Sequence, residues 1–163
     1  MQITPEHAWM NLKRKFPERI SFNFPDAKYI SIAKKNAELI AKNMGFKEEH
    51  VYDIGLIVDE AFVNAVEHGA RKYSSGVTVD FLVYEDKLEI IVEDNGCGFD
   101  IDATKVPDDL ICLHSTRGRG LGLMKLLTDE FEIITAVGAG TRVQMIKYID
   151  SRADCSINDD FLI

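Results

Sequence analysis

Apolar and polar positions recur along the chain with two periods, one typical of strands and the other of helices. Three segments, at residues 20–24, 77–84 and 88–92, alternate apolar and polar side chains, as strands with one buried face do. Two further strands are predicted at residues 131–137 and 141–149. Polar residues 85–87 separate the second segment from the third, which is a hairpin signal. Residues 138–140, Gly-Ala-Gly, join the last two segments.

Two longer segments show helical periodicity. In the first, Asp26 follows a proline and predicts an N-cap, and Gly45 predicts a C-cap, so the helix runs to about Met44. Its apolar stripe consists of Ile30, Ala33, Ala37, Ile40, Ala41 and Met44. The second helix, at about residues 48–69, is apolar around most of its circumference, which predicts that it is buried.

One polar stripe interrupts the apolar surface of the second helix. Glu60, Asn64 and Glu67 stand at positions i, i+4 and i+7, so they lie on one side of the helix. Burying such groups without partners costs about 1–3 kcal/mol for each group. The stripe therefore faces solvent, another polar group or a ligand, and the sequence alone leaves these three alternatives open.

The apolar run 90–92 ends in Glu93-Asp94-Asn95-Gly96-Cys97-Gly98. This pattern delivers the Asp94 carboxylate to the edge of a sheet, and Gly96 and Gly98 let the backbone turn and approach a flat ligand. A carboxylate accepts a hydrogen bond from an amino group and repels a carbonyl, which distinguishes adenine from guanine. An ordinary turn uses the same residue types, so that alternative stays open. A calcium loop is disfavoured, because Lys105 occupies the position of its closing glutamate.

A second glycine-rich motif follows a long polar connection. Residues 100–117 show little periodicity, and their length favours a functional lid. Gly118, Gly120 and Gly122 then open a helix predicted at residues 121–129. Such a turn gathers backbone N–H groups that suit phosphate, but it matches neither the dinucleotide fingerprint nor a Walker A loop. Glycines before a helix also occur in plain loops.

Composition narrows the class of protein. A chain of 163 residues is the size of one domain, and its net charge of −8 argues against nucleic acid as a partner. No apolar run has membrane-spanning length, and the first residues lack a signal-peptide core. The three cysteines, at positions 97, 112 and 155, are too scattered for a disulfide framework or a zinc site. We expect a cytoplasmic protein.

The order of these motifs resembles the ATP-binding fold of the gyrase, Hsp90, histidine-kinase and MutL superfamily over residues 20–149. Residues 59–69 are similar to those of the small bacterial anti-sigma factor serine kinases, and the sequence has no phosphoacceptor-helix domain in front. The resemblance implies an α+β fold, a two-layer α/β sandwich whose mixed, mainly antiparallel sheet packs on helices. We expect a helical N-terminal segment at 1–19 and an acidic tail at 150–163.

The resemblance also implies roles for single residues. Glu60 would be the general base, and Asn64 would coordinate Mg²⁺. Asp94 would accept from the adenine amino group, with Thr141 helping through water. The other nucleotide-binding positions that it implies are Gly96, Gly98, Arg117, Gly118, Arg119, Gly120, Leu121 and Gly122. The run Arg-Gly-Arg-Gly does not decide which arginine reaches the γ-phosphate.

The implied function is that of an ATP-dependent serine/threonine protein kinase. Such a kinase, commonly a homodimer, sequesters a sigma factor and phosphorylates an anti-sigma factor antagonist. One alternative is an ATP-binding module that sequesters a regulator without phosphotransfer, and another is a detached histidine-kinase catalytic domain. Glu60 favours the serine/threonine kinase, because a pure binder does not require that carboxylate.

Overall fold

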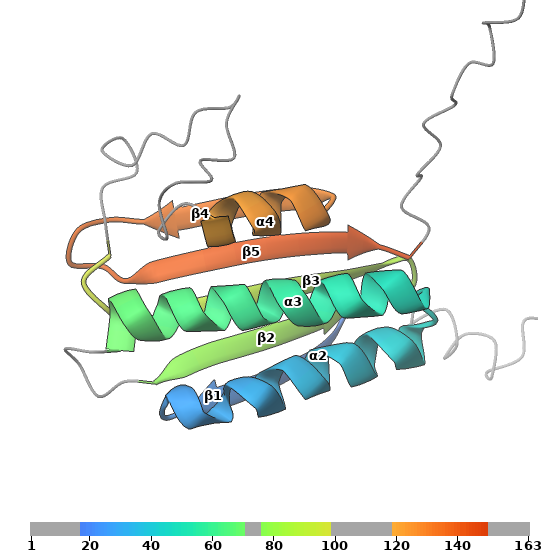
Figure 1. The fold of residues 1–163 in the computed structure, drawn as a ribbon, viewed down its shortest axis with the longest axis horizontal. Coiled ribbons are helices and arrows are strands. Elements are labelled where there is room, and N and C mark those ends of the chain that lie inside the picture. The colour runs from blue at the N-terminus through green and yellow to red at the C-terminus, as the bar shows by residue number, and fades with distance from the viewer. Residues whose placement is uncertain (1–16, 71–75, 99–118, 150–163) are drawn as a thin grey trace, which may run out of the picture.

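A computed structural model describes residues 17–70, 76–98 and 119–149. In these residues five strands form one sheet, in the order β1-β2-β3-β5-β4, and helices cover one of its faces (Figure 1). The strands are β1 (Glu18–Phe24), β2 (Val77–Val83), β3 (Lys87–Asp94), β4 (Glu130–Thr135) and β5 (Thr141–Tyr148). All five predicted strands are therefore found, and the two-layer α+β fold is confirmed.

The expectation of a mixed sheet was wrong for the described strands, because each neighbouring pair is antiparallel. The connections explain the difference. Two helices rather than one connect β1 to β2. The chain therefore runs along the sheet once in each direction and returns to the end where β1 finished. The strand that follows must then run back beside β1.

The helices are α2 (Ile30–Met44), α3 (Glu48–Asn64) and α4 (Arg119–Leu127), with a 3₁₀ turn η1 (Ala27–Tyr29) before α2. The predicted C-cap of the first helix is confirmed, whereas the predicted N-cap residue, Asp26, caps the 3₁₀ turn η1 that leads into α2. The Asp26 carboxylate accepts from the N–H of Lys28 at 2.9 Å, and Gly45 adopts the left-handed conformation at φ +90°. None of the described helices has the length and apolar character needed to span a bilayer.

Two helix boundaries differ from the predicted ones. The helix expected over residues 48–69 ends its α-helical part at Asn64 and continues as a π-helical segment, η2 (Ala65–Ala70). Widened turns of this kind are frequent at functional sites. The helix expected from residue 121 begins at Arg119.

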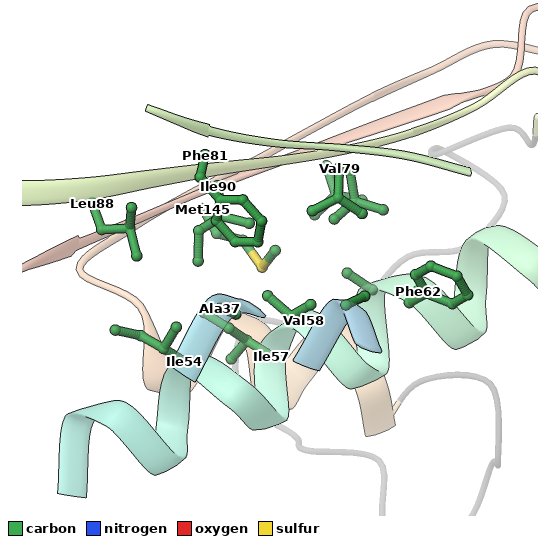
Figure 2. Close-up of a cluster of buried hydrophobic side chains, with 14 of the residues drawn as sticks. Ala37, Ile54, Ile57, Val58, Phe62, Val79, Phe81, Leu88, Ile90 and Met145 are labelled. Atoms are coloured by element: carbon green, nitrogen blue, oxygen red, sulfur yellow. The ribbon is translucent and has the colours of Figure 1, made fainter. Parts of the chain in front are cut away.

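The core lies between α3 and the sheet. Figure 2 shows Phe81, Leu88 and Ile90 pointing from the strands toward Ile54 and Val58 of α3. Beside α3, on the same face of the sheet (Figure 1), α2 carries a narrow stripe of fully buried alanines that lets the two helices approach closely: Ala33, Ala37 and Ala41. The predicted burial of α3, the second predicted helix, is confirmed. Its buried residues are Val51, Ile54, Gly55, Ile57, Val58, Ala61 and Phe62.

Three expected segments fall wholly or largely outside the described residues. These are the N-terminal segment 1–19, the lid 100–117 and the tail 150–163. Of the first, residues Glu18 and Arg19 belong to β1, which begins two residues earlier than its alternating pattern predicted.

The sheet face opposite the helices carries polar pairs, and one of them contains a buried carboxylate. Arg19 on β1 donates to the carboxylate of Asp80 on β2 at 2.6 Å, and Asp80 is only 1% exposed. Burial raises the pKa of Asp80, but hydrogen bonds from Arg19 and Ser21 and the positive charges of Arg19 and Arg142 together outweigh this, so that the pKa lies below its ordinary value. The folded state therefore favours the ionised carboxylate.

This pair predicts a pH dependence of stability. Because the pKa of Asp80 is lower in the folded chain than in the unfolded one, its stabilisation is present above about pH 4 and is lost as the pH falls through the folded value. Asp80→Asn removes this titration, so its free energy of unfolding should fall less steeply with acidification than that of the wild type. Urea unfolding followed by circular dichroism at a series of pH values measures both slopes.

The partner variant supplies the control. Arg19→Met keeps the carboxyl but removes the group that lowers its pKa most, so the loss of stability should begin at a higher pH than in the wild type. Parallel pH curves for the wild type and both variants would contradict the assignment of the acid-sensitive stability to this pair.

Candidate functional site

One row of register partners crosses all five strands at the end where β3 finishes. It runs from Phe24 to Val77, Asp94, Thr141 and Thr135. The residues of this row are apolar on β1 and β2 and polar on β3, β5 and β4. The fold thus places the Asp94 and Thr141 that the sequence singled out directly opposite each other on adjacent strands.

The Asp94 carboxylate is held by its own backbone. It is 7% exposed, and its Oδ1 accepts from the N–H of Gly96 at 2.8 Å, which forms an Asx turn. Gly140 packs against the same residue, because a Cβ on Gly140 would overlap the Asp94 carbonyl oxygen. At this end of β3, the Gly96 N–H therefore orients the Asp94 carboxylate, and the packing of Gly140 positions the backbone that carries it.

The turn between β4 and β5, residues 136–140, packs on the loop that follows Asp94. The N–H of Gly138 donates to the carbonyl of Cys97 at 2.7 Å. A Cβ on Gly98 would overlap a carbonyl oxygen of this turn, and Gly98 has a φ of +56°, so only glycine fits without strain. A backbone segment does approach Gly98 closely, but it is the β4–β5 turn, and the approach of Gly98 to a ligand stays a prediction.

Glu60 and Asn64 on α3 meet the start of α4. A Cβ built on Gly120 would lie 2.8 Å from the Glu60 Oε2 atom and 3.2 Å from the Asn64 Nδ2 atom. Both side chains are partly buried, whereas Glu67, the third member of the polar stripe, is exposed. The first two residues of the stripe therefore face the glycine-rich helix start, and only the third is a plain solvent-facing residue.

Gly120, Leu121 and Gly122 lie in the first turn of α4, which Arg119 opens. The first N–H groups of an α-helix make no hydrogen bond within it and carry partial positive charge, which suits an anion. Gly122 has open space around the position of its missing Cβ. Arg117 and Gly118, named as candidates from the sequence, lie outside the described residues.

Figure 1 shows how these parts gather. The end of α3, the loop after β3 and the turn between β4 and β5 all lie at the left-hand end of the view, and α4 starts toward the same side. Segments far apart in the sequence thus converge at one end of the sheet. One group contains Asp94, Gly96, Gly98 and Thr141, and the other contains Glu60, Asn64 and Gly120.

The residues present fit a magnesium ion only if another molecule supplies most of its ligands. The described residues hold no group of three or more His, Cys, Asp or Glu side chains that could bind a metal. Mg²⁺ in nucleotide sites is commonly held by one or two protein oxygens, by phosphates and by water. The Asn64 side-chain carbonyl, one such protein oxygen next to the start of α4, is compatible with that arrangement.

Sequence reasoning missed the contribution of the β4–β5 turn and of Thr135. The hydroxyl of Thr135 donates to the carbonyl of Gly140 at 2.9 Å and lies 3.2 Å from the hydroxyl oxygen of Thr141. The two glycines of the turn, Gly138 and Gly140, were a usable signal because they directly precede a candidate residue. Nothing in the alternating pattern of β4 distinguished Thr135 from an ordinary strand residue.

Comparisons with known proteins identify the family of the chain. Residues 25–147 match a family model described as histidine kinase-like ATPase domain. A serine-protein kinase RsbW of Listeria monocytogenes is 33% identical over 144 residues, which cover 83% of this chain and 90% of the relative. The serine-protein kinase RsbW of Bacillus subtilis is 33% identical over 129 residues, 75% of this chain and 79% of the relative.

A solved structure supports the fold alone. A chain in the crystal structure of the SiaB–SiaC complex from Pseudomonas aeruginosa superposes with a TM-score of 0.59 at 13% identity, covering 86% of this chain and 95% of that one. The family match spans most of the chain, and the relatives exceed 30% identity over more than two thirds of it. The chain therefore belongs to the histidine kinase-like ATPase family and, within it, to the anti-sigma factor serine kinases.

Proposed function

We propose that this chain transfers the γ-phosphoryl group of ATP to a serine or threonine of an anti-sigma factor antagonist. This reaction controls whether the chain binds a sigma factor. The observation that carries the proposal is the contact of Gly120 with Glu60 and Asn64. It brings a carboxylate and an amide to a helix N-terminus, which is the set of groups that phosphoryl transfer requires.

The purine end of the proposed site is the row at the end of β3. Asp94 accepts a hydrogen bond from the adenine amino group, and Thr141 on the adjacent strand assists through water. Gly96 and Gly98 line the pocket for the adenine base. Because the Gly96 N–H already binds the Asp94 carboxylate, that carboxylate is oriented before the nucleotide arrives. Such preorganisation lowers the entropic cost of binding.

The phosphate end is the start of α4. The backbone N–H groups of Gly120, Leu121 and Gly122 bind phosphate oxygens, together with Gly118. Of the two arginines, Arg119 lies at the first position of α4, and Arg117 precedes the described part of that segment. We assign an arginine of this pair to the γ-phosphate without choosing between them.

Glu60 is the general base of the proposed reaction. Its carboxylate accepts the proton of the incoming serine hydroxyl, and its partial burial beside α4 keeps it close to the phosphates bound there. Asn64, one turn later on α3, holds Mg²⁺ through its side-chain carbonyl. The ion, when bound, neutralises charge on the phosphate oxygens.

The proposed partners follow from the family. The substrate is an anti-sigma factor antagonist, the sequestered protein is a sigma factor, and the kinase acts as a homodimer in the cytoplasm. A net charge of −8 remains unfavourable for direct contact with nucleic acid.

Incubation with γ-labelled ATP and a purified antagonist tests the activity. Label on the antagonist that survives acid is expected, because phosphoserine is acid-stable. Acid-labile label on a histidine would instead identify a histidine kinase. Tight ATP binding without any phosphoprotein would leave the chain as a regulator-sequestering module, the second candidate function.

The role of Glu60 predicts a selective loss of phosphotransfer. Glu60→Gln should bind ATP as the wild type does, but its rate of phosphotransfer should fall by about a hundredfold or more, since the proton acceptor is gone. Glu67→Gln is the matched control: it makes the same chemical change on the same stripe, at an exposed position. Single-turnover transfer of label measures both rates. Equal rates in the wild type and Glu60→Gln would remove the general-base assignment.

The Gly120 contact predicts the effect of one methyl group. Gly120→Ala places a Cβ 2.8 Å from the Glu60 Oε2 atom, so that carboxylate must shift, and phosphotransfer should fall by at least about tenfold. Gly122→Ala adds the same methyl group to the same helix in open space and should lose less activity. The two variants are compared at saturating ATP, with thermal unfolding as the check on folding. An equal loss in both would show that the contact with Glu60 is irrelevant.

The metal assignment predicts that the contribution of Mg²⁺ to ATP affinity depends on Asn64. In the wild type, ATP should bind more tightly with Mg²⁺ than with EDTA, whereas Asn64→Ala should bind ATP with nearly the same affinity in both conditions. Isothermal titration calorimetry gives the four dissociation constants. If Mg²⁺ raised the ATP affinity of Asn64→Ala as much as that of the wild type, other residues would be the metal ligands.

A further inference from the structure

Lys147 is a cationic residue buried on the helix-facing side of the sheet. It lies opposite Leu88 of β3, and on β5 it shares its face with Val143 and Met145, which belong to the core. It is only 8% exposed. A buried ammonium group without a partner is strongly destabilising, so the fold has to supply an acceptor for it.

The acceptor is the C-terminal end of α4. The Lys147 Nζ atom donates to the carbonyl of Leu127, the last residue of that helix, at 2.9 Å. The last carbonyls of an α-helix have no partner within the helix, and they carry partial negative charge. An ammonium group supplies both a donor and a positive charge, so Lys147 joins the end of α4 to β5.

Two more hydrogen bonds fix the chain just beyond this helix. The Asp129 N–H donates to the Ile146 carbonyl at 2.9 Å, and the Asp129 carboxylate accepts from the Tyr148 N–H at 2.7 Å. Both bonds hold a residue that follows the end of α4. Of these three contacts with β5, only the one from Lys147 reaches the helix itself.

We infer that Lys147 is a positioning residue for phosphate binding, because it fixes the place of α4 along β5. This inference rests on the proposed phosphate site at the start of the same helix. α4 has nine residues, so at 1.5 Å for each residue its two ends are only about 13 Å apart. Its hydrogen-bonded backbone keeps that length constant. A shift at the C-terminal end therefore moves the N–H groups at the start relative to Glu60 and Asn64.

One strand thus serves both ends of the proposed nucleotide site. Thr141, at the start of β5, lies opposite Asp94 at the purine end. Lys147, near the end of β5, holds the helix whose start is the phosphate end. The spacing between the two ends depends on how α4 is attached to β5, and the ammonium group is the part of that attachment that a substitution can remove.

The test compares ATP with adenosine, which lacks phosphates and reports on the purine end alone. Lys147→Met keeps the length and the apolar stem of the side chain but removes the ammonium group. The ratio of the adenosine dissociation constant to the ATP dissociation constant should fall by about tenfold, while adenosine binds as it does to the wild type. Calorimetry with the full chain and Mg²⁺ gives the ATP constant, and NMR chemical-shift titration gives the weaker adenosine constant.

A matched control removes a hydrogen bond at the same end of α4. The Thr128 hydroxyl donates to the Met124 carbonyl at 2.7 Å, so Thr128→Val loses a contact within this segment and none with β5. Its ratio of dissociation constants should equal that of the wild type. Thermal unfolding checks that each variant is folded. Lys147→Leu provides a second deletion of the ammonium group if the methionine variant does not fold.

The outcomes separate this inference from the proposed function. If the wild type prefers ATP and the Lys147 variant keeps the same ratio, the role of Lys147 is overturned and the phosphate site stands. This holds also when both affinities fall together, because a general loss of structure weakens both ligands. A Thr128→Val variant with an equally lowered ratio overturns the role as well. If the wild type binds ATP no more tightly than adenosine, the proposed phosphate site itself fails.

Discussion

The packing of α3 is the interaction on which the rest of the structure depends. This helix contacts β3 of the sheet, α2 and α4, and most of its apolar residues are buried by these neighbours. Only one side remains for polar groups, and on that side Glu60 and Asn64 face the start of α4. Because polar groups at a partly buried position are costly without partners, this arrangement favours a ligand that supplies them.

The two ends of the candidate site are built by different physical means. At the purine end, backbone contacts set the geometry: the loop after Asp94 is bound by Gly138, and Gly140 packs on Asp94 itself. At the phosphate end, two helices meet, and the absence of a side chain on Gly120 determines how closely they do so. In both places glycine acts by allowing one segment to lie against another.

The strands and helices could be predicted because their signals are local. Alternation along β2 and β3 follows from burying one face of a sheet, and the N-cap at Asp26 and the glycine after Met44 are short-range signals of a helix start and end. The π-helical segment η2 and the start of α4 were not predicted, because the ends of helices respond to packing as well as to propensity. The direction of strand pairing likewise depends on the path of the connections, which a periodic pattern does not contain.

For the site, the sequence by itself determined the residue types and their order along the chain. It singled out the acid at the end of a strand, the carboxylate and amide one helical turn apart, and the glycines before a helix, because each type has chemistry that does not depend on its neighbours. Only the tertiary structure decided which of them meet. Asp94 lies opposite Thr141, Gly120 lies against Glu60, and Thr135 reaches Thr141 through the pairing of β4 with β5. Such contacts join segments distant in sequence, and they arise from strand register and helix packing.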